Sequence, residues 1–313
     1  MRVLAETGAS GQTSWRDLRI RLISAAVLAP LGLACLFNGG WVFVGLVLLI
    51  MIGIGVEWAG LTRTQPRSFS YPMLLAWPAV SLCVSIGTDW LAGLRVLLAG
   101  LLLGPVRGAG IILTGLGGLA LVWLRGMTGA GIASLLFVVL VVWASDSLAY
   151  LVGRAFGGRK LAPRISPGKT WSGAIGGLLG AMLAGMLVSA FASTGETQGM
   201  AERILRGLVF GGLLGVSAQA GDLAESAFKR RCGVKDSGRL IPGHGGLLDR
   251  LDGLLIAAPV AALLSFGCSY GHGFWQLDPL HLQPLDIDAR HMPSGWIEGQ
   301  IAPPVMSAGD KTP

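Results

Sequence analysis

The segment from Ser226 to Asp252 reads SAFKRRCGVKDSGRLIPGHGGLLDRLD, and it lies between two strongly apolar segments. It combines basic side chains, three aspartates, a histidine and several glycines. Charges at or near hydrocarbon are costly unless they are paired, hydrated or bound to a ligand. This segment therefore predicts a functional site at the edge of a membrane-embedded bundle.

The composition predicts an all-α, polytopic integral membrane protein. Hydrophobic residues make up 52% of the 313-residue chain, charged residues 13%, and the mean hydropathy is +0.65. Soluble domains carry about 25% charged residues, and a helix needs about 20 apolar residues to cross a bilayer. About nine such spans are predicted, at 22–37, 41–61, 71–86, 91–106, 108–124, 131–152, 172–191, 205–221 and 251–270. The pair that meets near 106–108 can be read as a helical hairpin or as a broken span.

The basic residues predict the orientation. They precede the first span, crowd the segment before the seventh and recur between the eighth and ninth, so an even number of spans separates these segments. The positive-inside rule places all three in the cytoplasm. We therefore expect a cytoplasmic segment at 1–21, a transmembrane catalytic domain at 22–270 in the cell (inner) membrane, and a disordered, Pro-rich tail at 271–313. The first span lacks a cleavage site and is interpreted as a retained anchor.

The net charge of +7 collects on the predicted cytoplasmic face, where it favours anionic lipid headgroups and phosphate-bearing substrates. No nucleic-acid-binding motif accompanies this charge, so nucleic acid is a poor alternative partner. The four cysteines show no metal-ligand spacing and predict neither a zinc site nor a disulfide framework.

Acidic residues gather at two predicted helix ends. Asp222, Glu225 and Lys229 are spaced i, i+3, i+7 and share one helical face. Asp249 and Asp252 are spaced i, i+3 in the first turn of the ninth span. Such oxygen-rich clusters suit Mg²⁺, which is held by one or two carboxylates plus substrate phosphates. The alternative is that these are ordinary charges at helix ends, where the dipole favours aspartate.

Between these helix ends, residues 242–246 form a loop with little side-chain bulk, so its amides can approach an anion and lead into a helix N-terminus. Phosphate is the expected guest, and an ordinary turn is the alternative. His244 could donate to a phosphate or orient a neighbour. Positive charge for several phosphates comes from Lys229, Arg230, Lys235, Arg239 and Arg250.

A second polar patch runs from Asp146 through Arg154 to Ser166-Pro-Gly-Lys169-Thr. The P-loop motif needs a glycine where this chain has Pro163, so that comparison fails. The patch is interpreted as a basic, glycine-punctuated loop suited to a phosphate or a nucleotide. Asp146 either pairs with one of its cations or contributes to the site.

The run from Ser226 to Asp252 resembles the signature of the phosphatidate cytidylyltransferases, the CDP-diacylglycerol synthases. The pattern is Ser-x-apolar-Lys-Arg, four residues, Lys-Asp-x-small, two residues, apolar-Pro-x-His-Gly-Gly-apolar-x-Asp-Arg-apolar-Asp, and every fixed position is present. The resemblance is sharp over 145–253, where the patch from Asp146 to Thr170 looks like the family's second marked region, and reduces to a hydropathy profile over the first 140 residues.

The resemblance implies transfer of CMP from CTP to phosphatidic acid, which lies in the lipid of the membrane. It also implies a requirement for Mg²⁺, and a second or monovalent cation is possible. A homo-oligomer is possible. The expected catalytic residues are Asp222, Lys229, His244, Asp249 and Arg250. The expected phosphate-binding residues are Arg154, Ser166, Lys169, Arg230, Lys235, Arg239, Gly245 and Gly246. Metal ligands are expected among Asp146, Asp222, Asp236, Asp249 and Asp252, with Asp222 and Asp249 foremost.

Two rival functions are less consistent with the residues. A CDP-alcohol phosphotransferase requires Asp-Gly-x-x-Ala-Arg, whereas Asp252-Gly253 is followed here by Leu-Leu-Ile-Ala. A transporter could gather intramembrane charge, but most of this charge lies in predicted loops and no inverted hydropathy repeat is evident.

Overall fold

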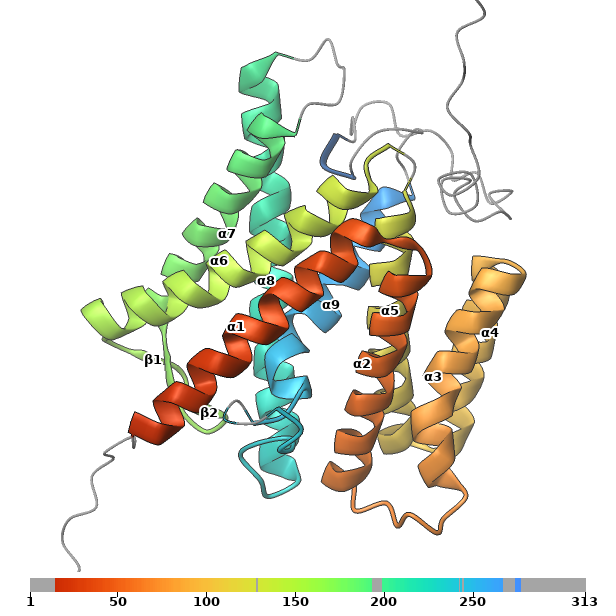
Figure 1. The fold of residues 1–313 in the computed structure, drawn as a ribbon. Helices are drawn as coiled ribbons and strands as arrows, with labels where there is room; N and C mark the ends of the chain where they lie inside the picture. The colour runs from red at the N-terminus through yellow and green to blue at the C-terminus, as the bar shows by residue number, and fades with distance from the viewer. Residues whose placement is uncertain are drawn as a thin grey trace, which may run out of the picture.

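The computed structural model describes residues 15–127, 129–192, 199–241, 243, 245–266 and 274–276, and these residues form a helical bundle with one small hairpin (Figure 1). The helices are α1 (Trp15–Asn38), α2 (Gly40–Leu61), α3 (Ser70–Gly87), α4 (Trp90–Ala99), α5 (Pro105–Gly126), α6 (Gly131–Phe156), α7 (Trp171–Phe191), α8 (Met200–Arg231) and α9 (Leu248–Ser265). Two 3₁₀ turns, η1 (Gly100–Leu103) and η2 (Phe274–Gln276), and two strands, β1 (Lys160–Ala162) and β2 (Ser166–Thr170), complete it.

Each predicted span falls on a helix, but the helices differ in length and polarity. Among the described residues, α2, α3, α5, α6, α7 and α8 are long and apolar enough to cross a membrane. In α1 the described segment Ala26–Asn38 is a shorter apolar helix, and α9 has charged residues in its first turns. The prediction of a mostly helical, polytopic membrane protein is confirmed, and six of the nine helices in the described part of the chain meet the length and hydropathy of a membrane span.

The predicted fourth span is wrong in its length. The helix α4 has 10 residues, about 15 Å, and η1 ends before Gly104, whose φ of 93° favours glycine. Pro105 then occupies the first turn of α5, where its missing N–H is tolerated. The helical-hairpin reading of this region is therefore the right one.

The all-α prediction also needs a correction, because residues 160–170 form an antiparallel hairpin rather than an irregular loop. Lys160 pairs with Thr170 and Ala162 pairs with Ser166. Thr170 ends β2 and also caps α7, since its side-chain oxygen accepts from the Gly173 amide at 3.1 Å. The hairpin therefore holds the basic patch at a fixed place before α7.

Glycines allow α6, α7 and α8 to pack closely. A Cβ on Gly176 would lie 2.5 Å from the Val152 Cβ, and one on Gly185 would lie 2.3 Å from the Gly207 carbonyl oxygen. Both distances are shorter than real Cβ contacts, so α7 packs closely on the Val152 side chain of α6 and on the backbone of α8. Small residues at these positions therefore bring α6, α7 and α8, the helices next to the basic hairpin, close together.

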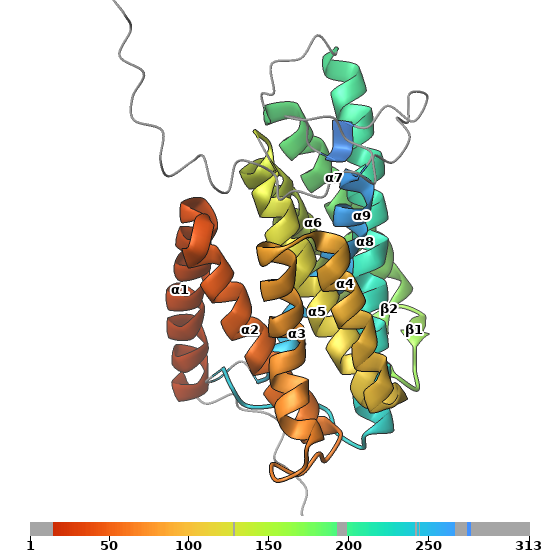
Figure 2. The ribbon, with the colours of Figure 1, turned by 90° about the vertical axis from the view of Figure 1, so that its right-hand side faces the viewer.

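The polar parts of the chain share one end of the bundle. The N-terminal end of α1, the hairpin, the C-terminal end of α8 and the beginning of α9 all lie toward the bottom of Figure 1. Figure 2 shows the same arrangement from the side, with α1 beside α2 at the edge of the bundle. The described parts of the three basic segments that the positive-inside rule places in the cytoplasm therefore lie at the same end of the bundle.

A short part of the predicted tail is packed. Phe274 and Trp275 in η2 are buried, and the Trp275 ring stacks on Phe137 with a centroid distance of 4.8 Å. The packed region thus extends beyond the boundary predicted at residue 270. The remaining residues of the predicted tail lie outside the described part of the chain.

Candidate active site

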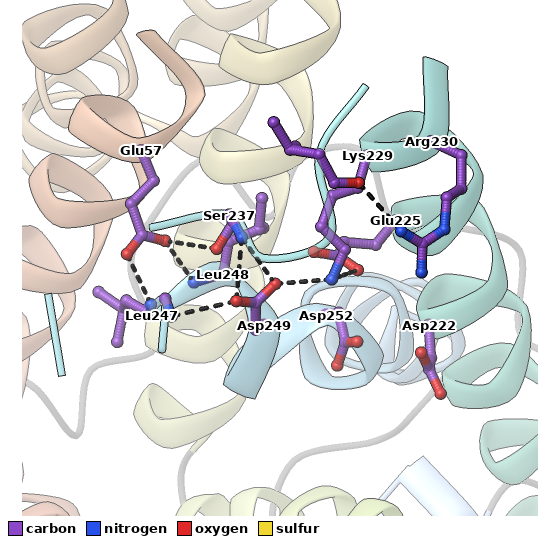
Figure 3. A network of polar contacts seen from close by, with 12 residues as sticks. Glu57, Asp222, Glu225, Lys229, Arg230, Ser237, Leu247, Leu248, Asp249 and Asp252 are labelled. Atoms are coloured by element: carbon purple, nitrogen blue, oxygen red, sulfur yellow. Dashed lines mark hydrogen bonds and ion pairs between the residues drawn. The ribbon is translucent and has the colours of Figure 1, made fainter. Parts of the chain in front are cut away.

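Asp249 lies in the first turn of α9 at the centre of a polar network (Figure 3). It accepts from the Lys229 Nζ at 2.6 Å, from the Ser237 amide at 3.0 and 3.1 Å, and from the Gly246 amide at 3.0 Å. Burial by itself raises the pKa of Asp249, but the Lys229 ammonium and these amide donors outweigh it and hold that pKa below its usual value. The charged form of Asp249 is the one this site stabilises.

Lys229 joins two acidic residues from different helices. Its Nζ lies 2.7 Å from the Glu225 Oε2 on α8 and 2.6 Å from the Asp249 Oδ1 on α9. The side chain of Glu225 is 3% exposed, and neither of its oxygens receives a well-directed hydrogen bond from the described residues. Lys229 therefore supplies the compensating charge for a carboxylate that is out of water. The predicted shared face of Glu225 and Lys229 on one helix is confirmed.

Glu57, near the C-terminal end of α2, is the site residue that sequence reasoning missed. Its buried carboxylate accepts from the Ser237 hydroxyl at 3.0 Å and from the amides of Leu247 and Leu248 at 2.8 Å each. These amides belong to the N-terminus of α9, where a negative charge is favoured. Glu57 thus completes the network from the far side of Ser237 (Figure 3).

The two carboxylates occupy the amides that were expected to bind phosphate. The Gly246 amide donates to Asp249, and the next two amides donate to Glu57. Gly245 is in a left-handed conformation with φ of 87°, and its carbonyl accepts from the Ile241 amide. A phosphate at this helix start would have to displace a carboxylate of the protein itself.

A separate pocket of about 540 Å³ lies between α6, α7, α8 and the hairpin. The charged and polar residues on its wall include Asp146, Arg154, Lys169, Gln219 and Asp222. Apolar and small residues, among them Ala149, Gly153, Leu161, Gly173 and Leu223, form the rest. The predicted second polar patch and the Asp222 end of α8 therefore meet in one cavity.

Within this pocket, Lys169 and Asp222 form an ion pair. Arg154 donates to the Tyr150 hydroxyl at 2.8 Å, and Asp146 is exposed. Asp146 lines the pocket, and it lies close enough to Lys169 for the two charges to interact. The carboxylates of Asp146, Asp222 and Asp252 are close enough to repel one another, so positive charge among them is favoured.

The carboxylates of the pocket suit a hard cation whose remaining ligands are substrate oxygens. In the described part of the chain, no three Asp, Glu, His or Cys side chains converge closely enough to hold a metal ion by themselves. Mg²⁺ usually takes only one or two carboxylates together with phosphate oxygens and water. Asp222 and Asp146 meet that requirement. The oxygens of Asp249 already accept from Lys229 and from two amides, so a metal ion there would have to replace one of these donors.

The other predicted residues lie around these two centres. Arg230 donates to the carbonyls of Ile165 and Val234 at 3.2 Å each, which ties the hairpin to the loop after α8. Exposed positions are held by Lys235, Asp236, Arg239 and Arg250. Ser166 begins β2 and does not line the pocket. His244 lies outside the described residues.

Comparison with known proteins accounts for this combination of a polar end and a membrane bundle. Residues 19–267 match the model of the cytidylyltransferase family. The chain belongs to this family. It is 40% identical over 264 residues to the phosphatidate cytidylyltransferase of Brucella abortus biovar 1 (strain 9-941), which covers 81% of this chain and 94% of that protein.

Two further family members support the same assignment. The chain is 37% identical over 275 residues to the phosphatidate cytidylyltransferase of Pseudomonas aeruginosa, covering 81% of this chain and 99% of that protein. It is 47% identical over 137 residues to that of Haemophilus influenzae, covering 44% of this chain and 46% of that protein. The resemblance drawn from the signature is confirmed, and it extends over the N-terminal half as well.

Proposed function

We propose that this chain transfers the cytidylyl group of CTP to phosphatidate, forming CDP-diacylglycerol and pyrophosphate for phospholipid synthesis. The observation that carries the proposal is the 40% identity to a phosphatidate cytidylyltransferase over 81% of the chain. The pocket supports it, because cations that suit phosphates and carboxylates that suit Mg²⁺ share one cavity at the end of a membrane bundle.

The chemistry requires positioning and charge neutralisation more than a strong base. A phosphate oxygen of the lipid attacks the α-phosphorus of CTP, and the bond from that phosphorus to the bridging oxygen of the β-phosphate breaks. The nucleophile is already an anion, so no proton has to be removed from it. Catalysis then rests on holding the reacting groups in line and stabilising the charge that develops.

Lys169 and Arg154 are the residues that we propose for the phosphates. Both line the pocket, and within the described residues Lys169 pairs with Asp222 and Arg154 with Tyr150, partners that a ligand can replace or share. Planar guanidinium groups and ammonium groups bind phosphate oxygens well. Substrate phosphates would therefore replace Asp222 as the partner of Lys169.

Asp222 is the proposed principal carboxylate for Mg²⁺, with Asp146 and Asp252 as further ligands. When bound there, Mg²⁺ would neutralise charge on the triphosphate. Exchange of Lys169 from Asp222 to a substrate phosphate would free a carboxylate oxygen. Asp249 is assigned instead to the framework that holds Lys229 and the loop, and Asp236 is assigned no role.

The membrane setting suits the two substrates. The acyl chains of phosphatidate remain in the bilayer, and the apolar pocket wall formed by Ala149, Leu161 and Leu223 suits the lipid side of the reaction. CTP arrives from water at the basic end of the bundle. By the positive-inside rule, we propose that this end faces the cytoplasm. A homo-oligomer stays a prediction.

The test is product formation by the purified protein in detergent. Phosphatidate, CTP and Mg²⁺ are expected to yield CDP-diacylglycerol and pyrophosphate in equal amounts, and ATP or omission of phosphatidate is expected to yield neither. Lys160, in the same hairpin but absent from the pocket wall, offers a matched control for Lys169. Folded protein that forms no product over a range of lipids and divalent cations would contradict the proposal.

A further inference from the structure

We propose that Glu57 is a positioning residue that fixes the α8 and α9 ends of the active site from α2. The inference rests on the proposed function, because the residues it positions matter only for that reaction. Glu57 is 4% exposed, and no pocket residue or predicted substrate ligand belongs to its helix. Its role is therefore to hold other residues in place.

Ser237 links Glu57 to Asp249. The hydroxyl of Ser237 donates to the Glu57 Oε2, and the amide of the same residue donates to both oxygens of Asp249. Asp249 in turn holds the Lys229 Nζ at 2.6 Å. Glu57 is thus three contacts from Lys229 along a continuous chain of hydrogen bonds, all drawn in Figure 3.

Two glycines of the signature leave room for Glu57. A Cβ on Gly238 would lie 2.6 Å from the Glu57 Oε1, and one on Gly246 would lie 2.9 Å from the Oε2 and 1.8 Å from the Ser237 Oγ. All three distances are shorter than real Cβ contacts, so any other residue at these positions would push the Glu57 or Ser237 side chain out of its place. The small residues of this segment therefore match the carboxylate of α2, which explains them without a bound phosphate.

The residue after Glu57 holds the end of α8. The rings of Trp58 and Phe228 stack with a centroid distance of 4.3 Å and an interplanar angle of 9°. Phe228 directly precedes Lys229. Trp58 is itself fixed by a hydrogen bond of 3.0 Å from its indole nitrogen to the Val106 carbonyl. Adjacent residues of α2 thus hold both elements that carry the Lys229–Asp249 pair.

The chemistry of the site requires a carboxylate at position 57. Leu247 donates to one oxygen, whereas Leu248 and Ser237 donate to the other. A carboxylate accepts on both oxygens, but a glutamine of the same shape would turn an NH₂ group toward one set of donors. Glu57→Gln is therefore a variant that keeps the volume and breaks the positioning.

The experiment compares the wild type, Glu57→Gln and Asp89→Asn. Asp89 caps α4 by accepting from the Ala92 amide at 2.7 Å, so it is a helix-capping carboxylate away from the site. We expect Glu57→Gln to lower kcat about tenfold or more while the KM for CTP changes less than about threefold. Asp89→Asn is expected to keep both constants. Hydrogen exchange of peptides that cover 246–250 is expected to be faster in Glu57→Gln only.

Several outcomes separate this inference from the proposed function. An inactive wild type contradicts the function, while the exchange measurement still tests the positioning. Unchanged kcat and unchanged exchange in Glu57→Gln would overturn the inference, and so would a kcat that falls only as far as Asp89→Asn lowers it. If Glu57→Gln fails to fold, Ser237→Ala provides the same test, because it removes the hydroxyl contact and keeps the amide contact.

Discussion

The pocket and the network at the start of α9 carry similar charged residues but differ in how those residues are held. The Lys169 and Asp222 side chains of the pocket pair are 26% and 33% exposed, whereas those of Lys229 and Asp249 are 12% and 13% exposed. The pocket pair therefore meets solvent and can exchange partners with a ligand. The network pair is held by backbone amides that donate to Asp249, and Glu57 from α2 binds the neighbouring residues Ser237, Leu247 and Leu248.

The difference shows that charge alone does not mark where a substrate binds. Both regions contain cationic side chains that suit phosphate and carboxylates that suit a metal ion. The signature from Ser226 to Asp252, however, contains most of the network. Buried charges with complete sets of partners hold backbone and side chains in place. Charges with few partners at the wall of a cavity are the ones that a substrate can reach. We therefore propose that the pocket binds the substrate and that the network positions the residues around it.

The largest expected effect on activity comes from Asp222→Asn. Loss of the principal Mg²⁺ carboxylate is expected to lower the rate of CDP-diacylglycerol formation by about 10²–10³-fold, the size seen when one group that stabilises developing charge is removed. The melting temperature should change little, because the pair with Lys169 is partly exposed. Raised Mg²⁺ should restore part of the rate. A rate within about threefold of wild type would contradict the metal assignment.

Asp249→Asn is expected to act on stability as well as on activity. It leaves Glu225 as the one acidic partner of Lys229 in the described structure and weakens the contacts with two amides. The free energy of unfolding should fall by roughly 3 kcal/mol, the lower end of the range for breaking a buried ion pair. Thermal unfolding in detergent measures the loss, and Mg²⁺ should not restore the rate. A fully stable variant that excess Mg²⁺ rescues would show that Asp249 binds the metal after all.

Lys169→Gln is expected to have a smaller effect, confined to binding. A lost hydrogen bond between an ammonium and a phosphate costs roughly 1.5–3 kcal/mol, so the KM for CTP or phosphatidate should rise at least about tenfold. Steady-state kinetics with each substrate varied in turn identifies which one Lys169 binds. The control Lys160→Gln changes the same charge on the same hairpin and should leave both KM values within about twofold.

The smallest expected effect comes from Glu202→Gln. Glu202, whose side chain is 48% exposed, forms an i, i+4 ion pair at 2.6 Å with Arg206 in the first turns of α8, far along the helix from the site. An i, i+4 ion pair on a helix contributes about 0.3–0.5 kcal/mol. Activity should not change, and the melting temperature should fall only slightly. A large loss of activity would mean that charge anywhere on α8 affects the reaction, which would weaken the distinction between the two regions.

Hydropathy predicted the helices well and their ends less well. In α8 the charged residues after Gly221 lower the hydropathy, so the predicted span stopped there, while the helix continues to Arg231 through its packing on α9. The hairpin was missed because its strands have three and five residues and contain proline, glycine and lysine. Such strands lack the alternation that identifies longer ones.

The sequence proposed candidate residues for the site but could not show how they pair. The spacing of Glu225 and Lys229 gave the correct helix face, but no spacing could show that Asp249 pairs with Lys229 while Asp222 pairs with Lys169. Glu57 left a signal that was overlooked, since it is the single charged residue in a 22-residue apolar helix. Its partner Leu247 is 190 positions away, so only the fold could identify the contact.

The most direct test of the account is an experimental structure with Mg²⁺ and a CTP analogue that carries a methylene group between the α- and β-phosphates. The account predicts the phosphates beside Lys169 and Arg154, the metal on Asp222, and Glu57 still bound to the amides of Leu247 and Leu248. Phosphates bound to the amides of residues 246–248, with Glu57 displaced, would contradict it and make the start of α9 the nucleotide site.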